Sequence, residues 1–272
     1  VRRILHQQTT LHVGVFPMSL THQSPYYQDD LVTIYHGDAR EILPIIPEEP
    51  NGAVITSPPY NLNMRVNKKR DYISRQVVDH EFSSKYYGYD DNLHPDDYYE
   101  LCLDVLGSCL TVAPVVFWNV QLATGNKPAL CSLLGTSGTE WLKEVVIWDK
   151  GHAQPAMKER TFNSAFEFIF IFDIRDPKTR QFPDATFPRG EMDNIWRIKP
   201  TPNPAHRATF PKELVARCFQ VDNAEVIIDP FMGSGTTLRT AKNFNKRAIG
   251  IEIEEKYCEI AANRMSEGVL AL

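Results

Sequence analysis

Short apolar runs that alternate with amphipathic stretches are the feature that most constrains the fold of this chain. The apolar runs have the length of β-strands, and they cover residues 53–55, 115–118, 144–148, 166–172, 225–228 and 247–251. The stretches between them are typical of helices, and they cover residues 95–110, 211–219, 236–244 and 255–265. Strands that alternate with helices predict an α/β fold with a doubly wound, mostly parallel sheet. Such a fold places its ligands at the carboxyl ends of the strands.

Two polar segments interrupt this alternation. Residues 61–92 contain a cluster of basic residues followed by several tyrosines, and residues 173–204 are rich in Pro, Arg and Asp without a clear period. Both are typical of long insertions at the rim of a sheet, where function tends to lie. Residues 1–28 form a polar arm that contains Gln and His. We therefore expect an arm followed by one domain over residues 29–272, whose inserted loops serve recognition.

The composition is that of an ordinary soluble globular protein, with 43% hydrophobic and 23% charged residues in a chain of 272. No apolar run approaches the roughly 20 residues of a membrane span, so no membrane partner is expected. The formal net charge of −5 argues against a protein that only coats nucleic acid, so any DNA-binding charge must be local. The five cysteines form no CxxC pair, which favours a reducing compartment and argues against a metal site.

A glycine loop follows the apolar run 225–228. It reads Asp229-Pro230-Phe231-Met232-Gly233-Ser234-Gly235-Thr236-Thr237 and leads into a predicted helix. The glycines permit a sharp turn and the close approach of a ligand, and the helix N-terminus suits a carboxylate. The next apolar run ends in Glu252, 17 positions after Gly235. An acid at that place can accept hydrogen bonds from ribose hydroxyls.

A tight turn and a solvated acid are the plain alternative for these residues. No Lys follows the glycines, so the segment is not a phosphate loop, and Thr236-Thr237-Leu238 departs from the full GxGxxG pattern. The combination of strand, glycine loop, helix, strand and acid favours a nucleoside that carries a carboxylate or an amine.

A second loop, Ser57-Pro58-Pro59-Tyr60, follows the apolar run 53–55. Its two prolines lack N–H donors and stiffen a loop whose carbonyls can face a cleft. The Ser57 oxygen and the Pro58 carbonyl can accept both protons of an exocyclic base amine, which localises the nitrogen lone pair for attack. Tyr60 can stack on a base that has been flipped out of a duplex. A Pro-Pro-Tyr sequence can also be a plain loop or a ligand of a WW-type module.

Together the two loops resemble those of the amino-methyltransferases that act on DNA. The loop that begins at Ser57 takes the place of the family's (Asp/Asn/Ser)-Pro-Pro-(Tyr/Phe) motif, and residues 229–235 look like its cofactor motif. The catalytic motif comes first, as in the family's β group. The resemblance runs from about residue 34 to residue 264. It implies a Rossmann-like methyltransferase fold, S-adenosylmethionine as cofactor, and direct methyl transfer without a covalent intermediate or a metal.

The resemblance assigns further residues to the cofactor. Asp38 and Ala39 match a segment whose acid lies near the cofactor adenine, although Asp38 alone would fit a turn acid equally well. Phe210 and Pro211 belong to a segment that resembles the one holding the methionine part, and Glu252 matches the ribose acid. Ser in the first catalytic position usually accompanies N4-cytosine specificity, and Asp accompanies N6-adenine specificity. We therefore expect methylation at N4 of cytosine.

The expected partners also follow from the resemblance. Double-stranded DNA is the expected substrate. Its phosphates are expected to contact a basic cluster that could otherwise be a solvated face, made of Arg65, Lys68, Lys69 and Arg70. The β group often forms homodimers, and a restriction endonuclease is a further expected partner. The expected location is the cytoplasm of a bacterium or archaeon.

Several other activities are open to different degrees. C5-cytosine methylation needs a Pro-Cys dipeptide, which the chain lacks. Methylation of a protein glutamine is accompanied by Asn in the place of Ser57 and by the opposite order of motifs. N6-adenine methylation is the closest alternative, and RNA could undergo the same chemistry. A catalytically idle DNA-binding subunit would keep the fold, but it would have no reason to retain both loops complete.

Overall fold

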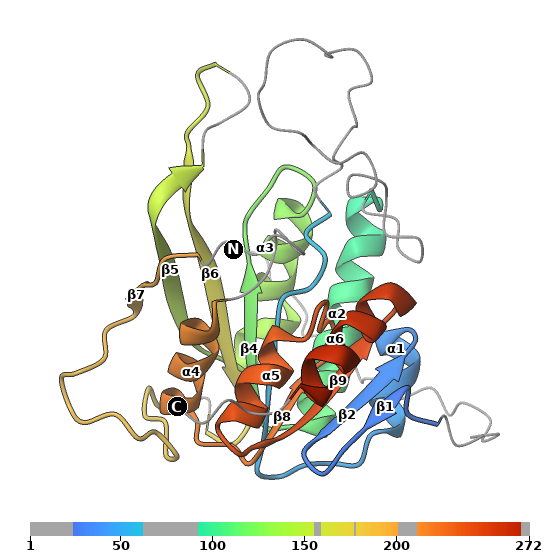
Figure 1. Cartoon of the computed structure of the whole chain (residues 1–272). Helices are drawn as coiled ribbons and strands as arrows, with labels where there is room; N and C mark the ends of the chain where they lie inside the picture. Colours follow the sequence, from blue (N-terminus) through green and yellow to red (C-terminus); the bar gives the residue numbers. More distant parts are fainter. Residues whose placement is uncertain (1–23, 62–91, 155–158, 177, 201–210, 268–272) are drawn as a thin grey trace, which may run out of the picture.

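The structure is a computed structural model that describes residues 24–61, 92–154, 159–176, 178–200 and 211–267. The described residues form one nine-stranded sheet with helices on both faces (Figure 1). The order of the strands across the sheet is β1-β2-β9-β8-β3-β4-β6-β5-β7. Their bounds are β1 Tyr27–Gln28, β2 Val32–His36, β3 Gly52–Thr56, β4 Val115–Val120, β5 Leu142–Gln154, β6 Ser164–Asp173, β7 Ile195–Arg197, β8 Val226–Asp229 and β9 Arg247–Glu252.

Five neighbouring strands, from β2 through β9, β8 and β3 to β4, run parallel to one another. Strand β6 runs antiparallel to both β4 and β5, and the edge strand β7 is parallel to β5. All residues of β3, β4 and β8 are buried, as expected for interior strands of a sheet that is covered on both faces. The prediction of a doubly wound, mostly parallel sheet is confirmed.

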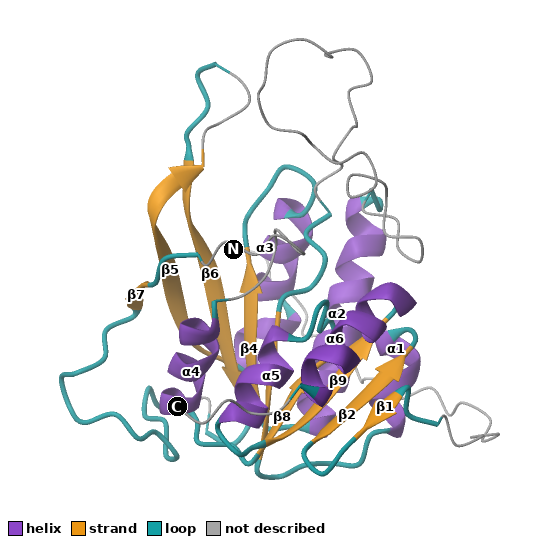
Figure 2. Cartoon of the chain, viewed as in Figure 1, coloured by secondary structure: helices purple, strands orange, loops and turns teal. Residues whose placement is uncertain are grey.

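Six α-helices of the described residues cover the two faces of the sheet (Figure 2). Helices α1, α2 and α3 share one hydrophobic core, and α4, α5 and α6 share the core on the other face. Neighbouring residues of β3 alternate between these cores, as the period of two in a strand requires. Among these helices, none has both the length and the apolar character needed to cross a bilayer. Their bounds are α1 Ala39–Ile42, α2 Pro95–Val112, α3 Lys127–Gly135, α4 Lys212–Val221, α5 Thr236–Asn243 and α6 Glu255–Ser266.

All strands and helices predicted from the sequence are present, whereas β1, β2, β7, α1 and α3 were missed. Strands β1 and β7 contain two and three residues, which is too short to show a period. The predicted N-terminal arm ended at residue 28, but Tyr27 and Gln28 form β1, which pairs with β2 at the edge of the sheet. The sheet therefore begins slightly earlier than the sequence indicated.

The predicted insertion 173–204 does not lie as a whole at the rim expected for recognition. Strand β6 is antiparallel to β4, with Asp173 opposite Val115, so the chain leaves β6 at the amino ends of the parallel strands. Arg175 fixes it there through ion pairs to Asp173 at 3.0 Å and Asp222 at 2.7 Å. The first part of the insertion thus lies at the edge of the sheet opposite to residues 57–60, which we call the catalytic loop. This position does not fit a recognition role for the whole segment.

Candidate active site

The two predicted loops leave the sheet side by side at the carboxyl edge of the parallel strands. Strands β3 and β8 are hydrogen-bonded neighbours, and they end at Thr56 and Asp229. The Thr56 hydroxyl donates to the Asp229 carboxylate over 2.9 Å, which joins the starts of the two loops. Strand β9, which ends in Glu252, pairs with the other side of β8. The strand order therefore brings the catalytic loop, the glycine loop and the predicted ribose acid to one place.

The glycine loop turns through two residues in the left-handed region. Gly233 has a φ of 51° and Gly235 a φ of 76°, which other residues adopt at a cost. A Cβ on Gly235 would lie 2.9 Å from the Cβ of Ala261, so the loop rests directly on α6. Arg264 of α6 also donates to the Ser234 carbonyl over 2.5 Å. Within the described residues, no side chain caps α5, so its first N–H groups can bind an anionic group of a ligand.

Asp229 organises the start of this loop. Its carboxylate accepts a hydrogen bond from the Phe231 N–H over 3.1 Å and another from the side chain of Thr237. Burial raises the pKa of Asp229 to about 6. Pro230 is buried beside it, and Thr236 opens α5. The loop between β8 and α5 is therefore anchored at both ends by the Asp229 carboxylate.

Glu252 lies beside the glycine loop and is itself buried. Its carboxylate accepts hydrogen bonds from the N–H groups of Gly233 and Glu254, each over 2.9 Å. Burial raises the pKa of Glu252 to about 7. These two bonds use about half of the lone-pair sites of a carboxylate, so the others can accept ribose hydroxyls. A buried acceptor beside a glycine turn and an uncapped helix fits a nucleoside with an anionic tail.

The residues predicted to lie near the adenine follow β2, next to Glu252. The Gly37 N–H donates to the Glu252 carbonyl over 2.9 Å. Asp38 caps α1 by accepting from the Arg40 N–H over 2.8 Å, and it forms an ion pair of 2.5 Å with the Arg40 guanidinium. This guanidinium lowers the pKa of Asp38. Ala39 is buried. Asp38 therefore has a structural role at this turn, and its contact with a cofactor stays a prediction.

Some predicted site residues lie outside the described residues. They are Arg65, Lys68, Lys69, Arg70 and Phe210. Pro211 is described, and it is buried directly before the first residue of α4. The assignments to phosphate contacts and to the methionine part of the cofactor therefore stay predictions.

The backbone of the catalytic loop is held by side chains from two helical segments. The Tyr98 hydroxyl of α2 donates to the Pro59 carbonyl over 2.7 Å. The amide of Asn126, which precedes α3, donates to the Tyr60 carbonyl over 2.7 Å. Within the described part of the chain, no donor is paired with the Pro58 carbonyl. Its role as an acceptor for a substrate stays a prediction.

A partly buried polar network connects the catalytic loop to β4, β5 and β6. The Tyr60 hydroxyl donates to the Glu167 carboxylate over 2.8 Å, and it accepts from the Ser57 hydroxyl at 2.9 Å and the Asn119 amide at 2.7 Å. The Asn119 amide also donates to Glu167 over 2.6 Å. Lys150 forms an ion pair of 2.5 Å with the same carboxylate. We call Ser57, Tyr60, Asn119, Glu167 and Lys150 the serine network.

Sequence reasoning missed three members of this network, namely Asn119, Lys150 and Glu167. A signal existed for Glu167, because it is the one charged residue in the apolar run 166–172 and a buried acid requires a partner. Asn119 and Lys150 stand at the ends of their apolar runs, where polar residues are ordinary. Their role depends on neighbours that only the sheet brings together.

The comparison with protein families identifies the chain. The family model of N6 and N4 methyltransferases, described as DNA methylase, matches residues 52–263, which is well over half of the chain. The chain belongs to the DNA methylase family. The matched residues of this DNA methylase include both the catalytic loop and the glycine loop, and the expected relationship to DNA amino-methyltransferases is confirmed.

Several known proteins are similar to this DNA methylase over most of their length. The type II methyltransferase M.ScaI of Streptomyces caespitosus is 26% identical, over 89% of this chain and 83% of that protein. The PvuII DNA methyltransferase, named as cytosine-N4-specific, superposes with a TM-score of 0.64 at 19% identity, over 92% of both chains. M1.HpyAVI, solved in complex with SAM, superposes with a TM-score of 0.54 at 20% identity, over 86% of this chain and 100% of that one. The methyltransferase fold is thereby confirmed.

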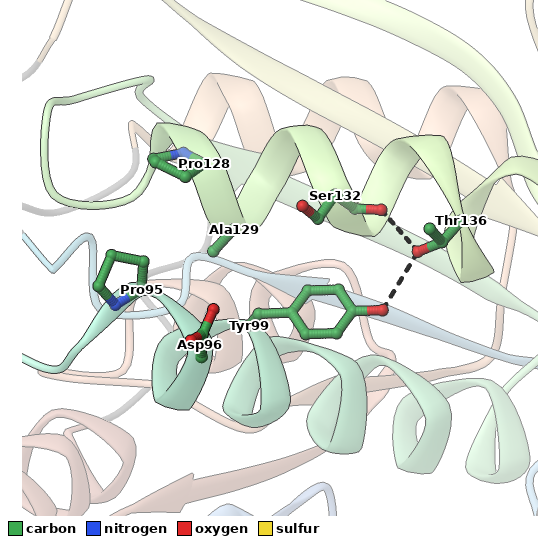
Figure 3. Close-up of a pocket in the computed structure, with 7 residues that line it drawn as sticks. All are labelled: Pro95, Asp96, Tyr99, Pro128, Ala129, Ser132 and Thr136. Carbon is green, nitrogen blue, oxygen red and sulfur yellow. Dashed lines mark hydrogen bonds between the residues drawn. The ribbon is translucent and has the colours of Figure 1, made fainter.

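A groove of this DNA methylase between α2 and α3 contains none of the predicted site residues (Figure 3). The Tyr99 hydroxyl lies 3.1 Å from the Thr136 hydroxyl, which donates to the Ser132 carbonyl over 2.6 Å and so ties the two helices together. The residues that line this groove are Pro95, Asp96, Tyr99, Pro128, Ala129, Ser132 and Thr136.

Among the described residues, no group of three or more His, Cys, Asp or Glu side chains could hold a metal ion.

Proposed function

We propose that this DNA methylase transfers a methyl group from S-adenosylmethionine to N4 of cytosine in double-stranded DNA. The observation that carries the proposal is Ser57 at the head of the catalytic loop, with its proton donated to Tyr60. Its oxygen and the Pro58 carbonyl are two uncharged acceptors for the two protons of an exocyclic amine. In this family, serine usually accompanies N4-cytosine specificity. The shared fold with the PvuII methyltransferase, which is named as cytosine-N4-specific, supports the proposal.

The glycine loop, α5 and Glu252 would hold the cofactor. Gly233 and Gly235 let the backbone come close to it, and the N-terminus of α5 would bind the methionine carboxylate. Glu252 would accept hydrogen bonds from the ribose hydroxyls. S-adenosylmethionine supplies an electrophilic methyl group when bound there. The SAM complex of the similar protein M1.HpyAVI supports this assignment.

The catalytic loop would turn a poor nucleophile into a better one. The lone pair of an exocyclic amine is delocalised into the ring of the base. Hydrogen bonds from its two protons to Ser57 and Pro58 would localise this lone pair in the direction of the methyl group. The Tyr60 hydroxyl is fixed by three hydrogen bonds, so its ring has a set orientation in which it can stack on a flipped base. Stacking of this kind offsets part of the cost of unstacking the base, about a few kcal/mol.

N6-adenine methylation is the second candidate, because the matching family model covers both N6 and N4 methyltransferases. The amine chemistry would be the same, so the mechanism would survive a change of base. The serine in place of an aspartate favours cytosine.

Four further proposals concern partners and location. We propose that DNA phosphates contact the basic cluster of Arg65, Lys68, Lys69 and Arg70. We also propose a homodimer, as the resemblance to the β group implies, and a cognate restriction endonuclease, which the type II names of the relatives support. Finally, we propose a cytoplasmic location, which fits the five free thiols of the chain.

The deciding experiment identifies the methylated nucleoside. Purified protein is incubated with isotope-labelled S-adenosylmethionine and unmethylated bacterial DNA of mixed sequence, and the DNA is digested to nucleosides for mass spectrometry. We expect labelled N4-methylcytosine. Labelled N6-methyladenine would overturn the choice of base and keep the mechanism. Bound cofactor without any labelled nucleoside would contradict the proposed DNA substrate.

A further inference from the structure

The Tyr60 hydroxyl uses all of its hydrogen-bonding capacity within the serine network. A phenol has one proton and two lone pairs. The proton goes to Glu167, because a carboxylate can only accept. The two lone pairs accept from Asn119 and from Ser57. Turning the Asn119 amide around would place its oxygen against the Glu167 carboxylate, so its orientation is fixed as well.

This arrangement decides the direction of the Ser57 hydroxyl. Since the proton of Tyr60 is already donated to Glu167, Ser57 can only be the donor in its bond to Tyr60. Its own proton then points into the domain, and the lone pairs of its oxygen stay available to a substrate. An acceptor is what the N–H groups of an exocyclic amine require. A serine whose proton pointed outward would instead repel those N–H groups.

The negative charge of Glu167, at the inner end of the series of hydrogen bonds, is stabilised in its buried position. The side chains of Glu167 and Lys150 are each 9% exposed and lie 2.5 Å apart, so the carboxylate is neutralised by an ammonium group. Lys150 also lies 5.4 Å from the centre of the Trp148 ring. Burial, followed by the charge of Glu167, raises the pKa of Tyr60 well above its usual range, so Tyr60 remains a proton donor at neutral pH.

We propose that Glu167 is a positioning residue that makes Ser57 an obligatory hydrogen-bond acceptor for the target amine, acting through the Tyr60 hydroxyl. Glu167 is not expected to touch the base or the cofactor. Its effect is to fix the direction of two hydroxyl protons: the Tyr60 proton points to the Glu167 carboxylate, and the Ser57 proton points to the Tyr60 oxygen. The inference rests on the proposed role of Ser57 and extends it to a residue on β6 that is 110 positions away in the sequence.

Glu167→Gln is the sharpest test, because it retains the shape of the side chain. Lys150 can only donate, so it holds the amide oxygen and leaves the amide N–H₂ facing Tyr60. The variant is made in an Asn119→Leu background and compared with Asn119→Leu alone here and in the tests below, because the Asn119 amide could otherwise turn and accept the Tyr60 proton through its own oxygen. In that background Tyr60 accepts from the new amide, its proton turns towards Ser57, and the Ser57 proton turns towards the substrate. We expect kcat on the bacterial DNA of the nucleoside assay to fall by at least about tenfold. The dissociation constant of S-adenosylmethionine and the apparent KM for DNA are expected to stay within about twofold.

Tyr60→Phe provides a second route that leaves the buried ion pair intact. It keeps an aromatic ring for stacking and removes the hydroxyl that connects Ser57 to Glu167. We expect a similar loss in kcat. In the Tyr60→Phe background, a further Glu167→Gln change is expected to alter kcat by less than about threefold, since the link is already broken. Glu144→Gln, which changes an acid on β5 that pairs with Arg180, is the matched control and is expected to retain the wild-type rate.

Two results would overturn the inference. One is an unchanged kcat in Glu167→Gln. The other is an equal loss with and without the Tyr60 hydroxyl, because a purely structural role of the Lys150–Glu167 pair would act in both backgrounds. Ser57→Ala in the same assay separates this failure from a failure of the proposed function. A slow Ser57→Ala variant beside a normal Glu167→Gln variant rejects only the role of Glu167, whereas a normal Ser57→Ala variant rejects the proposed role of Ser57 itself.

Discussion

Ser57 and Glu252 are ordinary residue types whose chemistry depends on their surroundings. The proposed role of Ser57 as an acceptor for the substrate depends on the donation of its proton to Tyr60. Glu252 holds the glycine loop through the Gly233 N–H, and its burial makes the protonated form more stable than in water. Substitutions that remove a single functional group can therefore test the role of each residue separately.

Removing the Ser57 hydroxyl tests the acceptor role directly. Ser57→Ala is expected to lower kcat by about 100-fold, the usual order for one lost preorganised hydrogen bond in a transition state. Cofactor binding is expected to stay within about twofold, because Glu252 and the glycine loop are untouched. Rates come from transfer of labelled methyl groups to DNA, and affinities from calorimetry. Ser132→Ala on the exposed side of α3 is the matched control, and unimpaired transfer by Ser57→Ala would contradict the assignment.

The pKa of Glu252 predicts a pH dependence of cofactor binding. The ionised carboxylate is the better acceptor for ribose hydroxyls, and its pKa of about 7 means that it is mostly protonated at pH 6. The affinity for S-adenosylmethionine is therefore expected to rise by about tenfold between pH 6 and pH 8 in calorimetric titrations. The Glu252→Gln variant is expected to bind S-adenosylmethionine weakly and with an affinity that no longer rises with pH. The Glu259→Gln variant, on the exposed side of α6, is expected to keep the pH dependence of the affinity. The same pH slope in Glu252→Gln would assign it to another group.

The same shift has a consequence for folding. The folded state holds the Glu252 proton with a pKa of about 7, against 4.5 for the unperturbed group, so it binds more protons than the unfolded state between these values. The contribution of Glu252 to the free energy of unfolding is therefore complete below pH 4.5 and is lost as the pH rises to about 7. Bound cofactor opposes this loss, because it favours the ionised form.

At the scale of elements, the glycine loop and α6 pack without room for one additional methyl group. Gly235 has a positive φ, and a Cβ there would lie 2.9 Å from Ala261. Gly107 in the middle of α2 has no heavy atom within 4 Å of the place of a Cβ. The two glycines therefore respond in opposite ways to the same substitution.

Gly235→Ala is expected to destabilise the domain by about 1–3 kcal/mol, from backbone strain and overpacking, and to weaken cofactor binding. Gly107→Ala is expected to stabilise it by up to about 1 kcal/mol, because alanine is the better helix former. Urea unfolding at constant pH measures both, with the slope m as a check on two-state behaviour. Equal stability of the two variants would contradict the close contact between the glycine loop and α6.

At the scale of the whole molecule, charge and topology limit where DNA can bind. The net charge of −5 leaves no general attraction to phosphates, so local basic segments must provide it. The stretch after β6 lies at the amino edge of the parallel strands, as Arg175 and its partners show. We therefore place the phosphate contacts in the basic cluster 65–70 and not in the first part of the 173–204 insertion.

Salt dependence distinguishes these two places. The double change Lys68→Ala with Lys69→Ala is expected to weaken DNA binding and to reduce the slope of log K against log salt by about 2. Fluorescence anisotropy of a labelled duplex over a range of salt concentrations measures this slope. The matched control, Lys178→Ala with Arg180→Ala, removes two exposed cations of the segment after β6 and is expected to leave the slope unchanged. An effect in the control alone would move the interface to the opposite edge.

The sequence by itself determined the alternation of strands and helices, the two loops and the position of Glu252. These features are local: the spacing of apolar residues, the lack of N–H groups in two prolines and the freedom of two glycines all act within a few residues. Their placement after β3, β8 and β9 follows from the rule that ligands bind at the carboxyl ends of parallel strands.

Only the tertiary structure decided the serine network and the direction of β6. Ser57, Asn119 and Glu167 are far apart in the chain, and nothing in their local sequences pairs them; strand pairing brings β4 and β6 together and sets Glu167 behind Tyr60. The direction of a strand likewise depends on how its connection packs, so an apolar run alone did not reveal that β6 is antiparallel and delivers residue 174 to the far edge. Long-range pairing selects among arrangements that are locally equivalent, and here it sets which way the Ser57 hydroxyl points.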